Sequence, residues 1–292
     1  MFKKSIVALI TPFLKDQIDE GAVEALVAWH LAQGTSALVV GGCTGEGPSL
    51  SHEEHRVLIR RARASTGGRL PLIAAASTFT TKDAVFLARQ AEKEGADALM
   101  VLTPPCLKPN QEGLFLHMKA VHDAAALPLM IYHNPGRTGG ALHDDTLARL
   151  ADLPRIAALK DSTDTLSWPL SLRLRFGDRF ALLSGEDPTF VAFLAQGGDG
   201  TVSVTANVAP KLYAALHDAW YAQDLAKVAR IRDRLFPLTK ALFCTTNPIP
   251  VKYAVSLLGH CRDEMRLPLV PPTPKEARLI KDALITAELL DA

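Results

Sequence analysis

The sequence predicts an α/β fold, a (β/α)8 TIM barrel followed by a C-terminal helical extension. Eight short apolar runs recur roughly every 20–35 residues, and each has the length of a buried strand. Amphipathic segments separate them, an alternation typical of parallel strands joined by helices. A doubly wound open sheet is the alternative, but such sheets usually have fewer strands, and no convincing nucleotide-binding fingerprint occurs here. The predicted strands are 5–10, 36–41, 70–76, 98–103, 127–132, 156–160, 180–185 and 200–205.

The helical segments carry recognisable start signals. Ser51 and Glu54 have capping-box spacing, and Thr80 occupies an N-cap position before the next amphipathic segment. The strand pattern stops after residue 208, and prolines punctuate the helical pattern that follows. We therefore expect a barrel over residues 1–208 and a helical region packed on it over residues 209–292, which supplies the last barrel helix.

Net charge, the N-terminal run and the spacing of cysteines and histidines argue against several classes of protein. The 292 residues are 48% hydrophobic with a formal net charge of +1, so bulk charge does not indicate nucleic acid or membrane binding. The N-terminal apolar run is short and interrupted by Pro12, which favours a first strand over a signal peptide. The four cysteines lack CxxC spacing and the histidines form no HExxH motif. We expect reduced thiols, no metal site and a cytoplasmic location.

The segments that follow the predicted strands define a candidate site, because active sites of such barrels lie at the C-terminal ends of the strands. The segment 41–47, GGCTGEG, is a turn whose backbone N–H groups can hold a small anion. It lacks the Gly-Lys-Ser/Thr of a nucleotide-binding loop, so a carboxylate is the expected ligand. Tyr132 and Arg137 follow the fifth strand. Each feature also has an ordinary interpretation: a tight turn, a half-buried tyrosine or a structural ion pair.

Lys160 ends the apolar run of the sixth strand. Taken alone, the stretch IAALKDS favours a surface lysine whose stem lies on the core and whose ammonium group reaches water. The alternative is a nucleophilic lysine whose amine is kept partly neutral by burial. A lysine, a phenol, an anion-binding turn and an arginine at one rim together suit Schiff-base chemistry on a keto acid.

Over nearly its whole length the chain resembles the dihydrodipicolinate synthase / N-acetylneuraminate lyase family of pyruvate-dependent class I aldolases. It is most similar to the dihydrodipicolinate synthase branch. The matching motifs are GxTGE at 42–46, Tyr132, PGRTG at 135–139, Lys160, SGED at 184–187, GGDGTVSVTANV at 197–208, NPIPVKYA at 247–254 and RLPLVPPT at 266–273.

The resemblance implies a reaction between pyruvate and L-aspartate 4-semialdehyde that yields 4-hydroxy-tetrahydrodipicolinate, in lysine and diaminopimelate biosynthesis. It implies a pyruvate imine on Lys160, proton relay through Tyr132, and a grip on the second substrate's carboxylate by Arg137. It also implies no metal or organic cofactor, and a homotetramer built as a dimer of dimers. The implied catalytic residues are Lys160, Tyr132, Thr44 and Cys43, and the implied substrate-binding residues are Cys43, Thr44, Arg137, Gly185 and Val202.

Two positions of the family's hydroxyl relay are thiols in this chain. Cys43 replaces a threonine of the glycine turn, and Cys106 replaces a tyrosine that reaches into the neighbouring subunit's site. A thiol is a weak hydrogen-bond donor and acceptor, with a pKa of about 8.5 against about 10 for tyrosine. We expect pyruvate capture to persist, because it uses backbone N–H groups. We expect synthase activity to be reduced, or replaced by another aldol reaction.

The family's feedback site for L-lysine also differs. His52, His55 and Asp83 match its pattern, whereas Phe79 and Pro105 replace an asparagine and a tyrosine. The sequence therefore predicts weak or absent inhibition by L-lysine.

Two other functions remain open at this point. A sister pyruvate aldolase would act on a keto-deoxy sugar acid, a hydroxy-oxoglutarate or N-acetylneuraminate. A catalytically idle barrel would serve as a binding or regulatory protein.

Overall fold

All eight predicted strands are present and close into one parallel barrel. The computed structural model describes residues 1–291. The strands follow the order β1-β10-β9-β8-β7-β6-β5-β4, and β1 pairs with both β10 and β4, so the predicted fold class is confirmed. The barrel strands are β1 (Lys4–Ala8), β4 (Ala37–Val40), β5 (Leu72–Ala75), β6 (Ala98–Leu102), β7 (Leu129–His133), β8 (Ile156–Asp161), β9 (Ala181–Ser184) and β10 (Gly200–Ser203).

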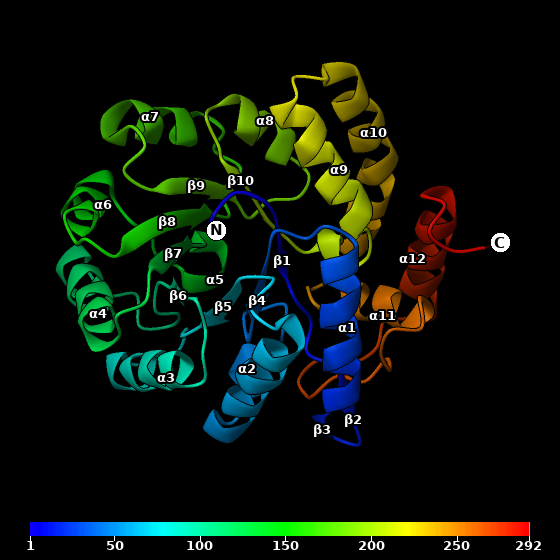
Figure 1. The fold of residues 1–292 in the computed structure, drawn as a ribbon, viewed down its shortest axis with the longest axis horizontal. Helices are drawn as coiled ribbons and strands as arrows, with labels where there is room; N and C mark the ends of the chain where they lie inside the picture. The colour runs from blue at the N-terminus through cyan, green and yellow to red at the C-terminus, as the bar shows by residue number, and fades with distance from the viewer. Residues whose placement is uncertain (292) are drawn as a thin grey trace.

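The helices surround the barrel, and the last ones gather on one side of it beyond α1 and α9 (Figure 1). Ser51 forms the predicted capping box with Glu54, and Thr80 caps the next helix. The helices are α1 (Glu20–Ala32), α2 (His52–Thr66), α3 (Thr81–Lys93), α4 (Gln111–Ala124), α5 (Pro135–Thr138), α6 (Asp144–Ala151), α7 (Ser167–Phe176), α8 (Phe190–Ala195), α9 (Pro210–Tyr221), α10 (Leu225–Leu242), α11 (Ile249–Leu257) and α12 (Pro274–Thr286), with the 3₁₀ turns η1 (Gly47–Ser49) and η2 (Thr205–Asn207).

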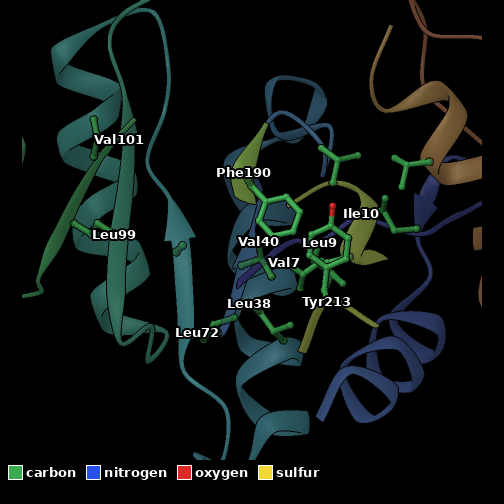
Figure 2. Close-up of a cluster of buried hydrophobic side chains, with 14 of the residues drawn as sticks. Val7, Leu9, Ile10, Leu38, Val40, Leu72, Leu99, Val101, Phe190 and Tyr213 are labelled. Atoms are coloured by element: carbon green, nitrogen blue, oxygen red, sulfur yellow. The ribbon is translucent and has the colours of Figure 1, made fainter. Parts of the chain in front are cut away.

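Both faces of each barrel strand are buried, which explains why the strands appear in the sequence as continuous apolar runs. Alternate residues such as Leu38, Val40 and Leu99 face outward and pack in the layer between strands and helices (Figure 2). The residues between them, such as Val39 and Met100, fill the inside of the barrel. A side chain's position along a strand therefore decides whether it can reach the interior.

The observed elements differ from the predicted ones at their ends. The first strand stops at Ala8, before Leu9 and Ile10, and β10 stops at Ser203, because Val204 is a bend and Thr205 begins the 3₁₀ turn η2. The sequence also gave no signal for the hairpin of β2 (Phe13–Leu14) and β3 (Gln17–Ile18). Each of its strands has only two residues, which is too short for an alternating pattern.

The C-terminal helices pack on the barrel and on one another. Helix α9 contacts β1, and α10 contacts both α9 and α12. The division at residue 208 stays a prediction, since α9 takes the place of a barrel helix. Within residues 1–291, no helix combines the length and apolar character needed to cross a membrane.

Candidate active site

A pocket of about 440 Å³ opens at the C-terminal ends of the strands. Six of the seven predicted site residues line it, so the structure brings together groups from four strand ends. The pocket is lined by Ala8, Gly42, Cys43, Thr44, Met100, Tyr132, Asn134, Gly136, Arg137, Lys160, Ser162, Gly185, Glu186, Val204, Phe243, Thr246 and Asn247.

Val202 is the predicted residue that does not line this pocket. It lies on β10 with no exposed surface, among the side chains that fill the barrel interior. Val204, two residues further along the chain, lines the pocket instead. The strand ends at Ser203, so Val202 packs beneath the pocket while Val204 stands at its wall.

Lys160 and Tyr132 lie side by side on the inner face of the barrel. Their Cα atoms are register partners on β8 and β7, so both side chains project in the same direction. The Lys160 Nζ atom lies 4.0 Å from the centre of the Tyr132 ring, and each residue is 5% exposed. The lysine does not extend into water, so its interpretation as a surface residue is wrong. Asp161 faces the opposite way and pairs with His133.

Gly185 leaves room for the lysine stem. A Cβ atom at this position would lie 2.7 Å from Lys160 Cε and 2.0 Å from Ser162 Oγ. Its backbone N–H donates a 2.6 Å hydrogen bond to the carbonyl of Asp161, which fixes the loop after β9 against β8. Because Gly185 has no side chain, the Lys160 side chain can occupy this position.

The glycine turn folds tightly on itself after β4. Gly47 N–H donates to the Gly42 carbonyl, and a Cβ atom on Gly47 would lie 1.9 Å from the Gly41 carbonyl oxygen. In the described part of the chain, the N–H groups of Cys43 and Thr44 make no backbone hydrogen bond. They remain available as donors at the pocket wall, as anion binding requires.

Arg137 lies on the short helix α5, and its side chain is exposed at the pocket mouth. Asn134 caps this helix, since its Oδ1 accepts a hydrogen bond from Arg137 N–H at 3.1 Å. The same side chain donates through Nδ2 to the Tyr132 hydroxyl at 2.9 Å. Asn134 therefore connects the phenol to the arginine, a role that sequence reasoning did not assign.

Sequence reasoning also missed Asn247 and Glu186. Asn247 Nδ2 donates to Thr44 Oγ1 at 3.1 Å, and its backbone carbonyl accepts from Arg137 Nη2 at 3.3 Å. Burial raises the pKa of Glu186 above its ordinary value, the neighbouring Asp187 raises it further, and Lys160 lowers it. Both residues lie in motifs that carry the family resemblance, and only the fold shows that they line the pocket.

The two thiols differ in position. Cys43 lines the pocket, whereas Cys106 is exposed in the loop after β6 and does not line it. Cys106 has a φ of +66°, a left-handed conformation that is uncommon outside glycine. Because Cys106 does not line the pocket, its part in the relay stays a prediction.

A second cavity of about 120 Å³ lies behind the glycine turn, and His52, His55, Phe79 and Pro105 contribute to its wall. His55 Nε2 forms a 2.8 Å hydrogen bond with the Ala75 carbonyl, and its Nδ1 lies 3.4 Å from the Gln90 amide nitrogen. Both ring nitrogens are therefore engaged within the fold.

Within residues 1–291, no group of three or more His, Cys, Asp or Glu side chains is placed to hold a metal ion.

A buried lysine against a phenol, inside a closed (β/α)8 barrel and beside a tight glycine turn, is the arrangement of a lyase of the class I aldolase kind. Residues 1–287 match the model of the dihydrodipicolinate synthetase family. The chain belongs to this family.

Individual relatives agree with the family match. The 4-hydroxy-tetrahydrodipicolinate synthase of Rhodospirillum centenum is 52% identical, and the match covers 99% of this chain and 100% of that protein. Dihydrodipicolinate synthase from Aquifex aeolicus superposes with a TM-score of 0.97 at 38% identity, covering 100% of both chains. The chloride-inhibited enzyme from Acinetobacter baumannii, in complex with pyruvate, superposes with a TM-score of 0.96 at 38% identity, covering 99% of this chain and 100% of that one.

Proposed function

We propose that this protein is a 4-hydroxy-tetrahydrodipicolinate synthase that condenses pyruvate with L-aspartate 4-semialdehyde. The observation that carries this proposal is the buried Lys160, whose amine stands 4.0 Å from the Tyr132 ring centre inside the barrel. Family membership and the 52% identical synthase support the choice of substrates.

The proposed reaction begins with attack of the Lys160 amine on the ketone carbon of pyruvate. Loss of water gives an imine, and loss of a methyl proton gives an enamine. The N–H groups of Cys43 and Thr44 would hold the pyruvate carboxylate, and the Tyr132 hydroxyl would carry protons to and from the reacting atoms. No metal or organic cofactor takes part, because the protonated imine itself withdraws electrons.

The second substrate would enter from the side of Arg137. The guanidinium group of Arg137 would bind its carboxylate, with the enamine carbon then attacking its aldehyde. The amino group of the new chain would attack the imine carbon, close the ring and release Lys160. This order requires both substrates in one pocket, and the pocket walls hold both the lysine and the arginine.

Turnover of pyruvate plus L-aspartate 4-semialdehyde, coupled to the downstream reductase, tests the proposal. Robust turnover supports it. A protein that forms a borohydride-trapped pyruvate adduct but shows no turnover would be a sister aldolase with another aldehyde. A protein that traps no pyruvate would be an idle barrel. The 52% identity to a named synthase does not favour either alternative.

We also propose a cytoplasmic homotetramer, assembled as a dimer of dimers. The family resemblance supports this assembly. Cys106 is exposed, and in the family the residue at this position reaches the relay of a neighbouring subunit, so the assembly would bring Cys106 to its neighbour's pocket. Light scattering and sedimentation of the purified protein measure the assembly directly.

The thiols of Cys43 and Cys106 are expected to lower the turnover number of the synthase reaction. The double substitution Cys43→Thr with Cys106→Tyr is expected to raise kcat roughly tenfold or more, because hydroxyl groups replace weak donors in the relay. Steady-state kinetics of the double variant and of each single variant measure this. Unchanged rates in all three proteins would contradict the relay argument.

Inhibition by L-lysine is expected to be weak or absent. Phe79 and Pro105 bring apolar surface where the family has polar groups, and His55 is engaged within the fold. Asp83 does not line the cavity, and its carboxylate accepts a hydrogen bond from the Thr80 hydroxyl at 2.9 Å. The coupled assay with added L-lysine measures inhibition, and half-inhibition at a sub-millimolar concentration would refute the prediction.

A further inference from the structure

The glycine turn contains a buried glutamate in a strained conformation. Glu46 has a φ of +52° and is 3% exposed. Left-handed backbone is unfavourable for a residue with a Cβ atom, and it persists where surrounding contacts enforce it. Glu46 is also bonded into the turn itself, because its N–H donates to the Cys43 carbonyl at 3.1 Å. A displacement of Glu46 would therefore also displace Cys43, which lines the pocket.

Both carboxylate oxygens of Glu46 are held by the C-terminal part of the chain. Lys252 Nζ, on α11, donates to Oε1 at 2.5 Å, and the backbone N–H of Arg266 donates to Oε2 at 3.2 Å. The Lys252 and Glu46 side chains are 0% and 1% exposed. A buried ion pair of this kind is costly to break on one side, because the remaining charge is left without a partner.

A second contact holds the turn from the same end of α11. Asn247 lies just before this helix, and its Nδ2 donates to Thr44 Oγ1 at 3.1 Å. The start of α11 thus contacts the turn on both sides of Gly45. Gly45 is itself fixed from the barrel, since the Thr11 hydroxyl donates to its carbonyl at 2.6 Å.

We infer that Lys252 is a positioning residue for the pyruvate carboxylate, and that it acts through Glu46 on the N–H groups of Cys43 and Thr44. The inference rests on the proposed function, because it assumes that these N–H groups bind pyruvate. A positioning role of Lys252 differs from a purely structural role of the ion pair in one measurable consequence. A structural role predicts lower stability of the protein, whereas a positioning role also predicts weaker pyruvate binding by the molecules that remain folded.

The test compares Lys252→Met and Glu46→Gln with a matched control, Arg173→Met. Arg173 forms a 2.6 Å ion pair with Asp199, and both side chains are 19% exposed. Asp199 lies just before β10, at the opposite end of the barrel from the pocket. Glu46→Gln keeps the size of the side chain, an acceptor for Arg266 N–H and a carbonyl oxygen toward Lys252, so it is the milder change and serves as the second variant if Lys252→Met does not fold.

The measured quantity is the pyruvate concentration that gives half-maximal borohydride trapping at Lys160, together with the KM for pyruvate and kcat. We expect Lys252→Met and Glu46→Gln each to raise the half-saturating pyruvate concentration about tenfold or more, because small displacements of binding groups weaken a site strongly. We expect kcat at saturating pyruvate to change much less, and the double variant to be no worse than the poorer single variant. Arg173→Met should lower thermal stability and leave pyruvate saturation unchanged.

Folded Lys252→Met or Glu46→Gln protein with wild-type pyruvate saturation would overturn the inference. An equal rise in the Arg173→Met control would overturn it as well, since the effect would then follow from lost stability. Trapping does not need the second substrate, so the inference can fail while the synthase assay succeeds. Wild-type protein that traps no pyruvate would overturn the proposed function and this inference with it.

Discussion

The substitution Lys160→Met is expected to abolish the pyruvate adduct and to lower turnover by at least about 10⁴-fold, the scale seen when a covalent nucleophile is removed. Methionine resembles lysine in length and fills the same buried space beside Tyr132, so the barrel should keep its fold. The loss therefore reports chemistry and not packing. Coupled kinetics and mass spectrometry after borohydride treatment measure it.

Lys82→Met is the matched control for this experiment, because Lys82 is exposed on α3, away from the pocket. The control should retain wild-type turnover and trapping. A trapped adduct in the Lys160→Met protein would show that another lysine forms the imine, and the assignment of the nucleophile would be wrong.

The substitution Gly185→Ala is expected to lower kcat by about 100-fold, the scale associated with a displacement near 1 Å of a reacting group. The added Cβ would meet Lys160 Cε at 2.7 Å and the Asp161 carbonyl at 3.2 Å. The Ser162 hydroxyl can rotate away, but the lysine stem and the backbone carbonyl must move. Kinetics should show the loss while circular dichroism shows a folded barrel.

Gly140→Ala serves as the control for this glycine. A Cβ at Gly140 would meet no atom within 4 Å, so turnover should stay near the wild-type value. Wild-type turnover in Gly185→Ala would mean that the lysine tolerates displacement. The reason offered for the absence of a side chain at this position would then be incorrect.

Local patterns in the sequence were enough to predict the barrel and to single out candidate residues at its strand ends. Strands buried on both faces must be apolar throughout, so the eight runs stand out without any knowledge of their partners. Tyr132 and Lys160 became candidates because they lie at or near the ends of such runs, and the family resemblance then favoured Lys160 as the nucleophile. Their mutual contact follows from the strand register, in which their Cα atoms are partners.

Features that depend on long-range contacts or on single positions could not be predicted in this way. Asn247 contacts Thr44 across 203 residues of sequence, and no short-range pattern reports such a pairing. Val202 and Val204 look alike in the sequence, but only Val204 lines the pocket. The orientation of Lys160 was ambiguous in its own stretch, since a lysine at a strand end can point into a barrel or extend into water.

The contacts of Glu46 have a consequence for the order of events during protein synthesis. Its partner Lys252 lies 206 residues later in the chain, and the backbone of Arg266 lies 220 residues later. A nascent chain can pair all eight strands once residue 203 has emerged from the ribosome, but the buried ion pair must await α11. All eight strands are therefore synthesised before the contacts that hold the glycine turn can form, and the proposed capture of pyruvate depends on a part of the chain that is made late in translation.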